Sequence, residues 1–252
     1  SFTKILAQTT LDAKRYQSLG LNNVLVTGNL KFDVSANSVQ VNEALLLRKE
    51  LNVGMQIVCA ASTREGEEEL IIAAWQKLKQ DCADLKNICL LIVPRHPQRF
   101  DDVGALLTKA FPHVPRKSTL TSRADLAAAI NQQGILLGDT MGEMSFYYAL
   151  SDFVVMGGSL QPLGGQNFIE ACALGRPIIL GQHTFNFQQA SLDVIDAEAG
   201  LRVDDVEGLS QAMGLLFTNH ELKEAMSTKA LDFANQHTGA TEKILAIVQS
   251  SH

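Results

Sequence analysis

Short apolar runs alternate with longer amphipathic stretches along the chain, and this alternation limits the possible folds more than any other feature. The apolar runs have the length of buried strands, and most are rich in β-branched residues or leucine; they span 24–26, 57–60, 88–93, 135–137, 153–156 and 178–180. The stretches between them place apolar residues at the three- and four-residue spacing of helices; they span 39–51, 65–80, 98–110, 143–150 and 167–174. This alternation predicts an α/β fold, a Rossmann-like parallel sheet with helices on both faces.

The two ends of the chain differ from its middle. Residues 4–7 and 24–26 are strand-like around a helix-like stretch at 11–19, whereas 206–250 is almost entirely helix-forming, with breaks near residues 219–220 and 238–239. The first residue is not methionine, so we expect a fragment of a longer protein. The expected organisation is the end of an N-terminal domain at 1–30, an interdomain linker at 31–38, the Rossmann-like domain at 39–236, and a C-terminal helix that crosses back at 237–252.

Composition excludes several classes of protein. Hydrophobic residues make up 46% and charged residues 19% of the 252 residues, as is usual for a globular protein. The longest apolar run, 88–93, is too short to span a bilayer. A net charge of -6 without a basic block argues against a broad nucleic-acid or anionic-membrane surface. The four cysteines lack the CxxC spacing, so we expect buried thiols rather than disulfides or a zinc site.

Glycines and polar residues follow the expected strands, in the loops at 61–67, 94–97, 138–143, 157–170 and 181–187. Ligands of open parallel sheets bind beyond the carboxyl ends of the strands, so these loops would share one edge. Together they supply glycines, helix N-termini, and the cationic side chains of Arg64, Arg95 and His96. This inventory fits a ligand that carries a phosphate and does not fit a neutral apolar ligand.

Each loop also has a purely structural explanation. Three segments match the capping box of a helix start or a near variant of it: Ser62 to Glu65, Thr140 to Glu143, and Asn167 to Glu170. The glycines at 138, 157 and 158 can serve turn geometry alone, and single histidines such as His96 and His183 are more often structural than catalytic. Only the joint placement of the loops on one edge favours a functional site.

Several common site motifs are absent from the sequence. There is no GxG, no glycine followed by lysine, no GxSxG, no HExxH and no DxD. These absences argue against the usual dinucleotide fingerprint, a P-loop, a nucleophile elbow and a dedicated metal site, and we expect neither a metal nor a cofactor. A Rossmann-like sheet with glycine-rich loops and an Asn-x-x-Glu helix start points instead toward nucleotide-sugar enzymes.

A series of segments resembles the bacterial Kdo (3-deoxy-D-manno-oct-2-ulosonic acid) transferases of lipopolysaccharide biosynthesis, in order and at matching spacing. The segments are 27–33, 61–69, 94–97, 138–143, 157–160, 164–170, 175–177 and 181–187. The resemblance runs from about Ala7 to about Asn186 and is weaker in the helical tail. Arg64 stands where many members have histidine, and Gln166 and Gln182 occupy positions with other common residues.

The resemblance implies a glycosyltransferase of the GT-B type, which has two facing Rossmann domains. Such an enzyme moves Kdo from CMP-Kdo to a lipid A precursor at the cytoplasmic face of the bacterial inner membrane. Its C-terminal domain holds the donor, whereas its N-terminal domain holds the acceptor site, the membrane-contacting surface and the catalytic base. This chain would therefore be a soluble donor-binding part without a catalytic residue of its own, and no nucleic acid is expected as a partner.

The residues expected to bind the CMP part of the donor come from the loops named above: Ser62, Thr63, Arg64, Arg95, His96, Met141, Gly142, Glu143, Gly158, Ser159, Asn167 and Glu170. Ser62, Arg64 and the amides of a helix that begins near Glu65 would form one half of a phosphate cradle, and the amides of residues 141–143 the other. Arg95 would add a bidentate contact. Glu170 would bind ribose hydroxyls, Asn167 would orient phosphate or ribose, and Lys31 would reach the carboxylate of the donor sugar.

Three other functions remain open at this point. The chain could be part of a UDP-sugar transferase or epimerase of the same architecture. It could be a non-catalytic nucleotide-binding or scaffolding domain. It could also be a structural α/β domain that binds no ligand.

Overall fold

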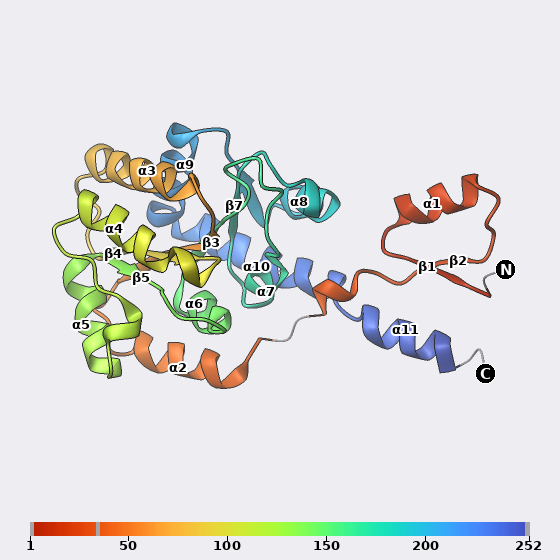
Figure 1. Cartoon of the computed structure of the whole chain (residues 1–252), viewed down its shortest axis with the longest axis horizontal. Helices are drawn as coiled ribbons and strands as arrows, with labels where there is room; N and C mark the ends of the chain where they lie inside the picture. Colours follow the sequence, from red (N-terminus) through yellow and green to blue (C-terminus); the bar gives the residue numbers. More distant parts are fainter. Residues whose placement is uncertain (1–2, 34–35, 250–252) are drawn as a thin grey trace.

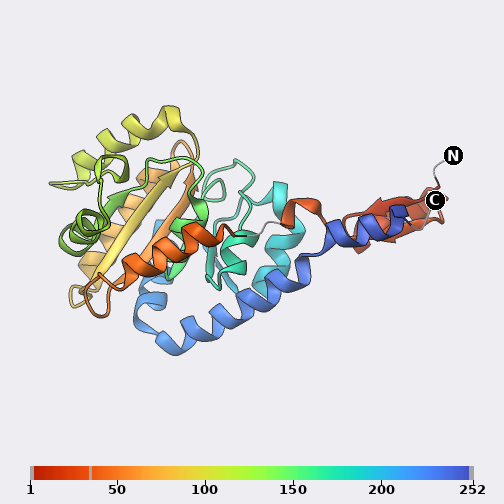
Figure 2. The same ribbon diagram turned by 90° about the horizontal axis from the view of Figure 1, so that it is seen from below.

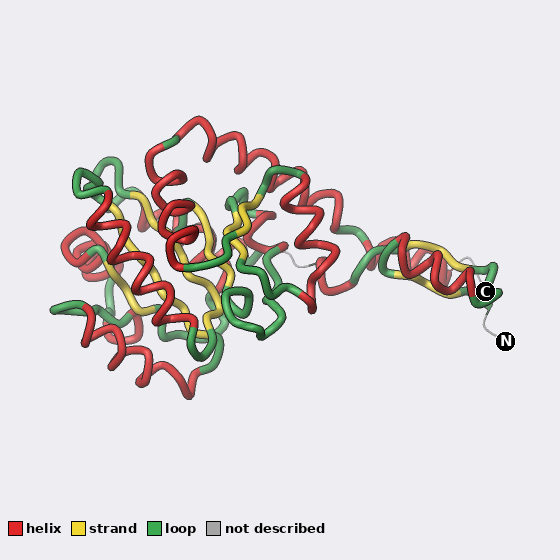
Figure 3. The backbone as a smooth tube through the Cα atoms, turned by 90° about the horizontal axis from the view of Figure 1, so that it is seen from above, coloured by secondary structure: helices red, strands yellow, loops and turns green. Residues whose placement is uncertain are grey.

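The computed structural model describes residues 3–33 and 36–249, without the side chain of Lys31. The remaining positions, 1–2, 34–35 and 250–252, belong to the expected domain ranges but lie outside the described residues. Most of the described chain forms a layered α/β body, and a small unit built from both ends of the chain extends away from it (Figure 1). In Figure 3 the strands of the body lie between helices on both sides.

The body is built on a parallel sheet in the order β5-β4-β3-β6-β7-β8. Its strands are β3 (Gln56–Thr63), β4 (Ile88–Pro94), β5 (Ile135–Leu137), β6 (Phe153–Met156), β7 (Ile178–Leu180) and β8 (Gly200–Arg202). The chain runs outward from β3 to β5, returns to the other side of β3, and continues outward through β8. The order therefore reverses between β3 and β6, and crevices at such a reversal are where open α/β sheets bind ligands.

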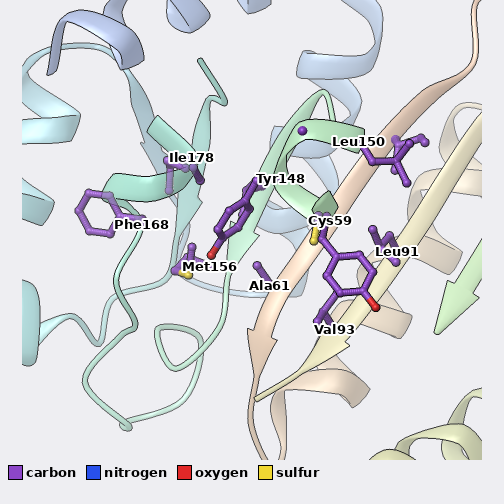
Figure 4. Close-up of a cluster of buried hydrophobic side chains, with 14 of the residues drawn as sticks. Cys59, Ala61, Leu91, Val93, Tyr148, Leu150, Met156, Phe168 and Ile178 are labelled. Atoms are coloured by element: carbon purple, nitrogen blue, oxygen red, sulfur yellow. The ribbon is translucent and has the colours of Figure 1, made fainter. Parts of the chain in front are cut away.

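Helices cover both faces of this sheet because the strands are apolar on both sides. One face packs against α2 (Ser38–Arg48), α5 (Arg123–Gln133), α6 (Met144–Leu150), α7 (Ile169–Ala173), α8 (Gln188–Asp196) and α10 (His220–His237). The other packs against α3 (Glu67–Asp81), α4 (Phe100–Ala110) and α9 (Val206–Thr218). Figure 4 shows the first core, where Cys59 and Ala61 of β3 lie near Tyr148 of α6.

The small unit pairs β1 (Ile5–Ala7) with β2 (Val24–Val26) in parallel, with α1 (Thr10–Ser18) between them in the chain. Helix α11 (Ala240–Gln249) leaves the body and runs beside this unit (Figures 1 and 2). Asp33 joins the two parts, because its carboxylate accepts hydrogen bonds from the backbone N–H groups of Gly239, Ala240 and Thr241. A hydrogen bond from the side chain of Thr241, together with these backbone hydrogen bonds, holds the pKa of Asp33 below its usual value against the effect of burial. The domain boundaries expected from the sequence stay a prediction.

The observed elements confirm the predicted fold class, and most strand positions agree with the apolar runs. Helices α5 and α8 and strand β8 were not expected from the sequence. Three helices start later than predicted, at Glu67, Met144 and Ile169, so the expected capping boxes do not form as such. Before α3 the reason is a tight turn: the φ angle is 55° at Ser62 and 82° at Gly66, which is the N-cap residue.

Candidate functional site

The loops after β3 and β6 meet at the reversal of strand order, and at Gly157 there is no room for a side chain. Gly157 donates its N–H to the carbonyl of Ala61 at 2.8 Å. A Cβ atom on Gly157 would lie 2.3 Å from the carbonyl oxygen of Ser62, so only glycine fits there. This contact places the turn 62–66 directly against the turn 157–160.

Glu67, the first residue of α3, connects these two turns. Its buried carboxylate accepts backbone N–H groups from Arg64 at 2.9 Å, Gly158 at 2.6 Å and Leu160 at 2.9 Å. Burial raises the pKa of Glu67 above its ordinary value, although these hydrogen bonds act in the opposite direction. This role of Glu67 is not predictable from the sequence, because a run of three glutamates at a helix start is typical of a solvated first turn.

Thr63 is fully buried, and its hydroxyl is already engaged. It donates to Oε1 of Glu68 at 2.7 Å. The Glu68 carboxylate also receives two hydrogen bonds from the guanidinium of Arg99, at 2.7 and 3.0 Å. Arg99, which was not among the predicted site residues, is occupied by its ion pair with Glu68. Thr63 supports the floor of the site in this structure.

Arg64 and Arg95 are different, because their side chains make no hydrogen bond or ion pair to any residue that the structure describes. Arg64 is half-buried in the turn after β3, and Arg95 is exposed after β4. The backbone N–H of Arg95 donates to the carbonyl of Thr63 at 2.9 Å, which brings the two loops together. His96 follows Arg95 and is half-buried. Two unpaired guanidinium groups beside glycine-rich turns form a surface suited to an anion.

Hydrogen bonds and ion pairs from residues 116–118 hold the loop after β5 in place. Burial raises the pKa of Asp139, but hydrogen bonds from Ser118 and Arg116 outweigh this effect and hold the pKa below its ordinary value. Glu143 forms an ion pair with Lys117 at 2.7 Å. The adjacent residues 141 and 142 are exposed, and they lie in a turn before α6 rather than within the helix.

Gly158 and Ser159 hold the second turn in place. The N–H of Gly158 is used by Glu67, as described above, and its φ angle is 72°. The hydroxyl of Ser159 is buried, donates to the carbonyl of Met156 and accepts the N–H of Gly181 at 2.9 Å. These atoms support the loop in this structure, and direct contact between either residue and a ligand stays a prediction.

Asn167 and Glu170 lie at the start of α7 on the same edge. The side chain of Asn167 accepts the N–H of Ile169 at 3.0 Å. One carboxylate oxygen of Glu170 accepts the hydroxyl of Ser145 at 2.5 Å, which links α7 to α6. The expected role of Lys31 falls on a side chain outside the described residues.

Two further features bear on the site and its setting. Among residues 3–33 and 36–249, no group of three or more His, Cys, Asp and Glu side chains is arranged to hold a metal ion. No helix in that part of the chain has the length and apolar character needed to cross a membrane.

Comparison with known proteins gives a consistent result, although no protein-family model matches the chain. A 3-deoxy-D-manno-octulosonic acid transferase from Bordetella pertussis is 41% identical over 247 residues, which is 96% of this chain and 55% of the relative. A protein of the same description from Haemophilus influenzae is 33% identical over 97% of this chain and 56% of its own length. The chain therefore spans about half the length of these curated relatives.

Solved structures give a related result. The C-terminal CMP-Kdo binding domain of WaaA from Acinetobacter baumannii has 29% sequence identity and a TM-score of 0.68, over 78% of this chain and 98% of that domain. The lipopolysaccharide glycosyltransferase WaaG, at 14% identity and a TM-score of 0.54, shares the fold. The chain is therefore homologous to the 3-deoxy-D-manno-octulosonic acid transferases over most of its length, and 78% of it matches the C-terminal CMP-Kdo binding domain of WaaA from Acinetobacter baumannii.

Proposed function

We propose that the carboxyl edge of this sheet binds CMP-Kdo, and that the longer protein moves Kdo from it to a lipid A precursor. One observation carries the proposal: almost the whole of the CMP-Kdo binding domain of WaaA corresponds to this chain, at 29% identity. The site lies at the reversal of strand order, where ligands of this fold bind. The unpaired guanidinium groups lie on the same edge.

Most of the predicted site residues contact the donor in this proposal, whereas Thr63, Gly158 and Ser159 support the turns around it. Cleavage of the donor leaves negative charge on the phosphate of CMP, and preorganised donors at that position lower the barrier. Arg64 and Arg95 supply positive charge next to the phosphate. Ser62, His96 and the backbone N–H groups of residues 141–143 supply hydrogen bonds to it. Glu170 accepts hydrogen bonds from ribose hydroxyls through the oxygen that Ser145 does not occupy, Asn167 orients phosphate or ribose, and Lys31 reaches the carboxylate of the sugar.

Transfer needs a base to deprotonate the acceptor hydroxyl, and the three glutamates that line the site are each engaged within the protein. Glu143 is paired with Lys117, Glu170 accepts from Ser145, and Glu67 is buried among backbone amides. The base, the acceptor site and the contact with the cytoplasmic face of the inner membrane are therefore assigned to an N-terminal domain that ends at residues 1–30. This chain alone should bind the nucleotide without turnover, and Kdo transfer by it would contradict the assignment.

Thermal unfolding with millimolar CMP, UMP or AMP in parallel, without added metal, tests the proposal. CMP at about ten times its Kd should raise Tm by about 3–6 °C, with smaller shifts for UMP and AMP. Preferential stabilisation by UMP would instead favour a UDP-sugar enzyme of the same fold. A Tm that none of the nucleotides changes would contradict nucleotide binding by this chain and favour a structural α/β domain.

A further inference from the structure

Glu67 is an unusual acidic residue, because it is fully buried and has no cationic partner among the residues that the structure describes. Its side chain is 0% exposed. The neighbouring Glu68 is equally buried, but its charge is matched by Arg99 at 2.7 Å. Only backbone groups and the N-terminal end of α3 offset the charge of Glu67.

The backbone donors to Glu67 come from both sides of the strand-order reversal. Oε2 accepts from Arg64, in the turn after β3, and from Gly158, in the turn after β6. Oε1 accepts from Leu160, also in the turn after β6. Gly157 has no room for a Cβ, and beside Glu67 the other side-chain link is a long hydrogen bond of 3.4 Å from Gln161 to the carbonyl of Gly66. The Glu67 carboxylate, with three short hydrogen bonds, therefore does most to set the position of one turn relative to the other.

Stability alone gives a poor reason for a carboxylate at this position. Burial raises the pKa of Glu67, so ionisation costs folding free energy. With a folded-state pKa above the unfolded one, this cost is absent below the unfolded pKa and develops as pH rises through the folded pKa. Glutamine would avoid the cost, but it has a single acceptor oxygen and would turn its NH2 group toward one of the N–H donors.

We propose that Glu67 is a positioning residue for phosphate recognition, which holds the turns 62–66 and 157–160 in the arrangement that the CMP phosphate requires. The inference rests on the proposed function, because it names the part of that site that Glu67 organises. Glu67 does not touch the ligand in this arrangement. It acts through the backbone of Arg64 and Gly158, so its loss should weaken recognition of the phosphate and spare recognition of the nucleoside.

The test compares Glu67→Gln with Glu69→Gln, which removes an exposed charge from the same helix turn. Affinities for CMP and for cytidine are measured by NMR titration. We expect Glu67→Gln to lose about tenfold or more in CMP affinity and to stay within about twofold for cytidine. Its Tm without ligand should fall by no more than about 4 °C, and Glu69→Gln should match the unsubstituted protein.

Amide hydrogen exchange provides a readout that needs no nucleotide. The N–H groups of Gly158 and Leu160 should exchange at least about tenfold faster in Glu67→Gln, while those of β3 and β6 keep their protection. If the unsubstituted protein does not bind CMP, the proposed function fails, and exchange at these two amides still decides whether Glu67 holds the turn.

Two results would overturn the inference. One is unchanged CMP affinity with unchanged protection of Gly158 and Leu160. The other is an equal loss of CMP and cytidine affinity together with a large fall in Tm, which indicates a structural role only. If Glu67→Gln does not fold, Glu67→Asp retains the charge on a shorter side chain, and the same selective loss of CMP affinity is expected of it.

Discussion

The amino and carboxyl edges of the six-stranded sheet differ in whether their charged side chains have partners within the protein. At the amino edge, Asp152 accepts hydrogen bonds from Arg48 and from the N–H of Ile57, both at 2.6 Å. Lys223 lies nearby, almost fully buried, and donates to the side chain of Gln56. At the carboxyl edge, two arginines have no partner within the described chain. At the amino edge Asp152 thus has its hydrogen bonds filled, although the buried Nε of Arg176 nearby has no acceptor among the described residues. At the carboxyl edge Arg64 and Arg95 are unpaired beside ion pairs such as Arg99–Glu68 and Lys117–Glu143.

This contrast separates groups that hold the sheet together from groups available to a ligand. A matched network contributes to folding, and removal of one member leaves the others buried without compensation. An unpaired surface cation contributes little to folding stability and is available to interact with a ligand. Substitutions at the two edges should therefore affect stability and binding separately, and each prediction below tests that separation.

The largest effect is expected for Asp152→Ala at the amino edge. The substitution leaves Arg48 and the N–H of Ile57 without their acceptor and should cost about 3 kcal/mol of folding free energy. The side chains of Asp152 and Arg48 are about one-fifth exposed, at 20% and 23%, which keeps the cost at the lower end of the range for buried pairs. Calorimetry should show Tm lower by about 6–12 °C. CMP affinity below the unfolding range should not change, and a parallel loss of affinity would remove the distinction between the edges.

Arg64→Ala should show the opposite pattern. Loss of a charge-assisted contact to phosphate should weaken CMP binding about tenfold to a hundredfold. Because Arg64 has no partner within the described chain, Tm without ligand should stay within about 2 °C. Arg202→Ala is a matched control, since Arg202 ends β8 at the same edge but outside the proposed site. Equal CMP affinity in Arg64→Ala and the unsubstituted protein, measured by titration calorimetry, would remove Arg64 from the site.

Arg95→Ala should give a smaller and more salt-dependent loss. Arg95 is exposed, so its contact with phosphate is screened, and we expect about a threefold loss of CMP affinity at 0.15 M salt. The ratio of the CMP affinities of the unsubstituted protein and the variant should approach one at 0.5 M salt. A loss that is independent of salt would mean that Arg95 shapes its loop instead of supplying charge.

Five of the six strands of the sheet could be predicted from the sequence because the information for each of them is local, whereas the short edge strand β8 was not predicted. Apolar runs mark the strands, and breaks near Asn219 and Thr238 separate the last three helices as observed. The edge that carries the candidate site also follows from the sequence, since all loops after parallel strands share one edge. Arg64 and Arg95 could be proposed on that basis alone.

The residues that hold each edge together could not be predicted in the same way. Glu67, Asp152 and Lys223 acquire partners only when segments far apart in the sequence meet. The N–H of Gly158 lies 91 residues from Glu67, and Lys223 lies 167 residues from Gln56. In the sequence, Glu67 looks like a solvated residue of a first helical turn. Thr63 and Ser159 show the converse, because predicted ligand contacts have hydroxyls that are occupied inside the protein.

The smallest effect concerns the pH dependence of the amino edge. Burial, together with the charge of Arg48, lowers the pKa of Lys223 against the opposing effect of Asp152 and Glu224. Because the unfolded chain then binds more protons between the lowered pKa and the usual 10.5, stability relative to Lys223→Met should rise with pH in that alkaline window. In thermal denaturation, the Tm of the unsubstituted protein relative to that of Lys223→Met should be higher at pH 10 than at pH 7. The exposed Lys86→Met serves as control, and a Tm difference that is the same at both pH values would mean that the positive charge of Lys223 is fully compensated at this edge.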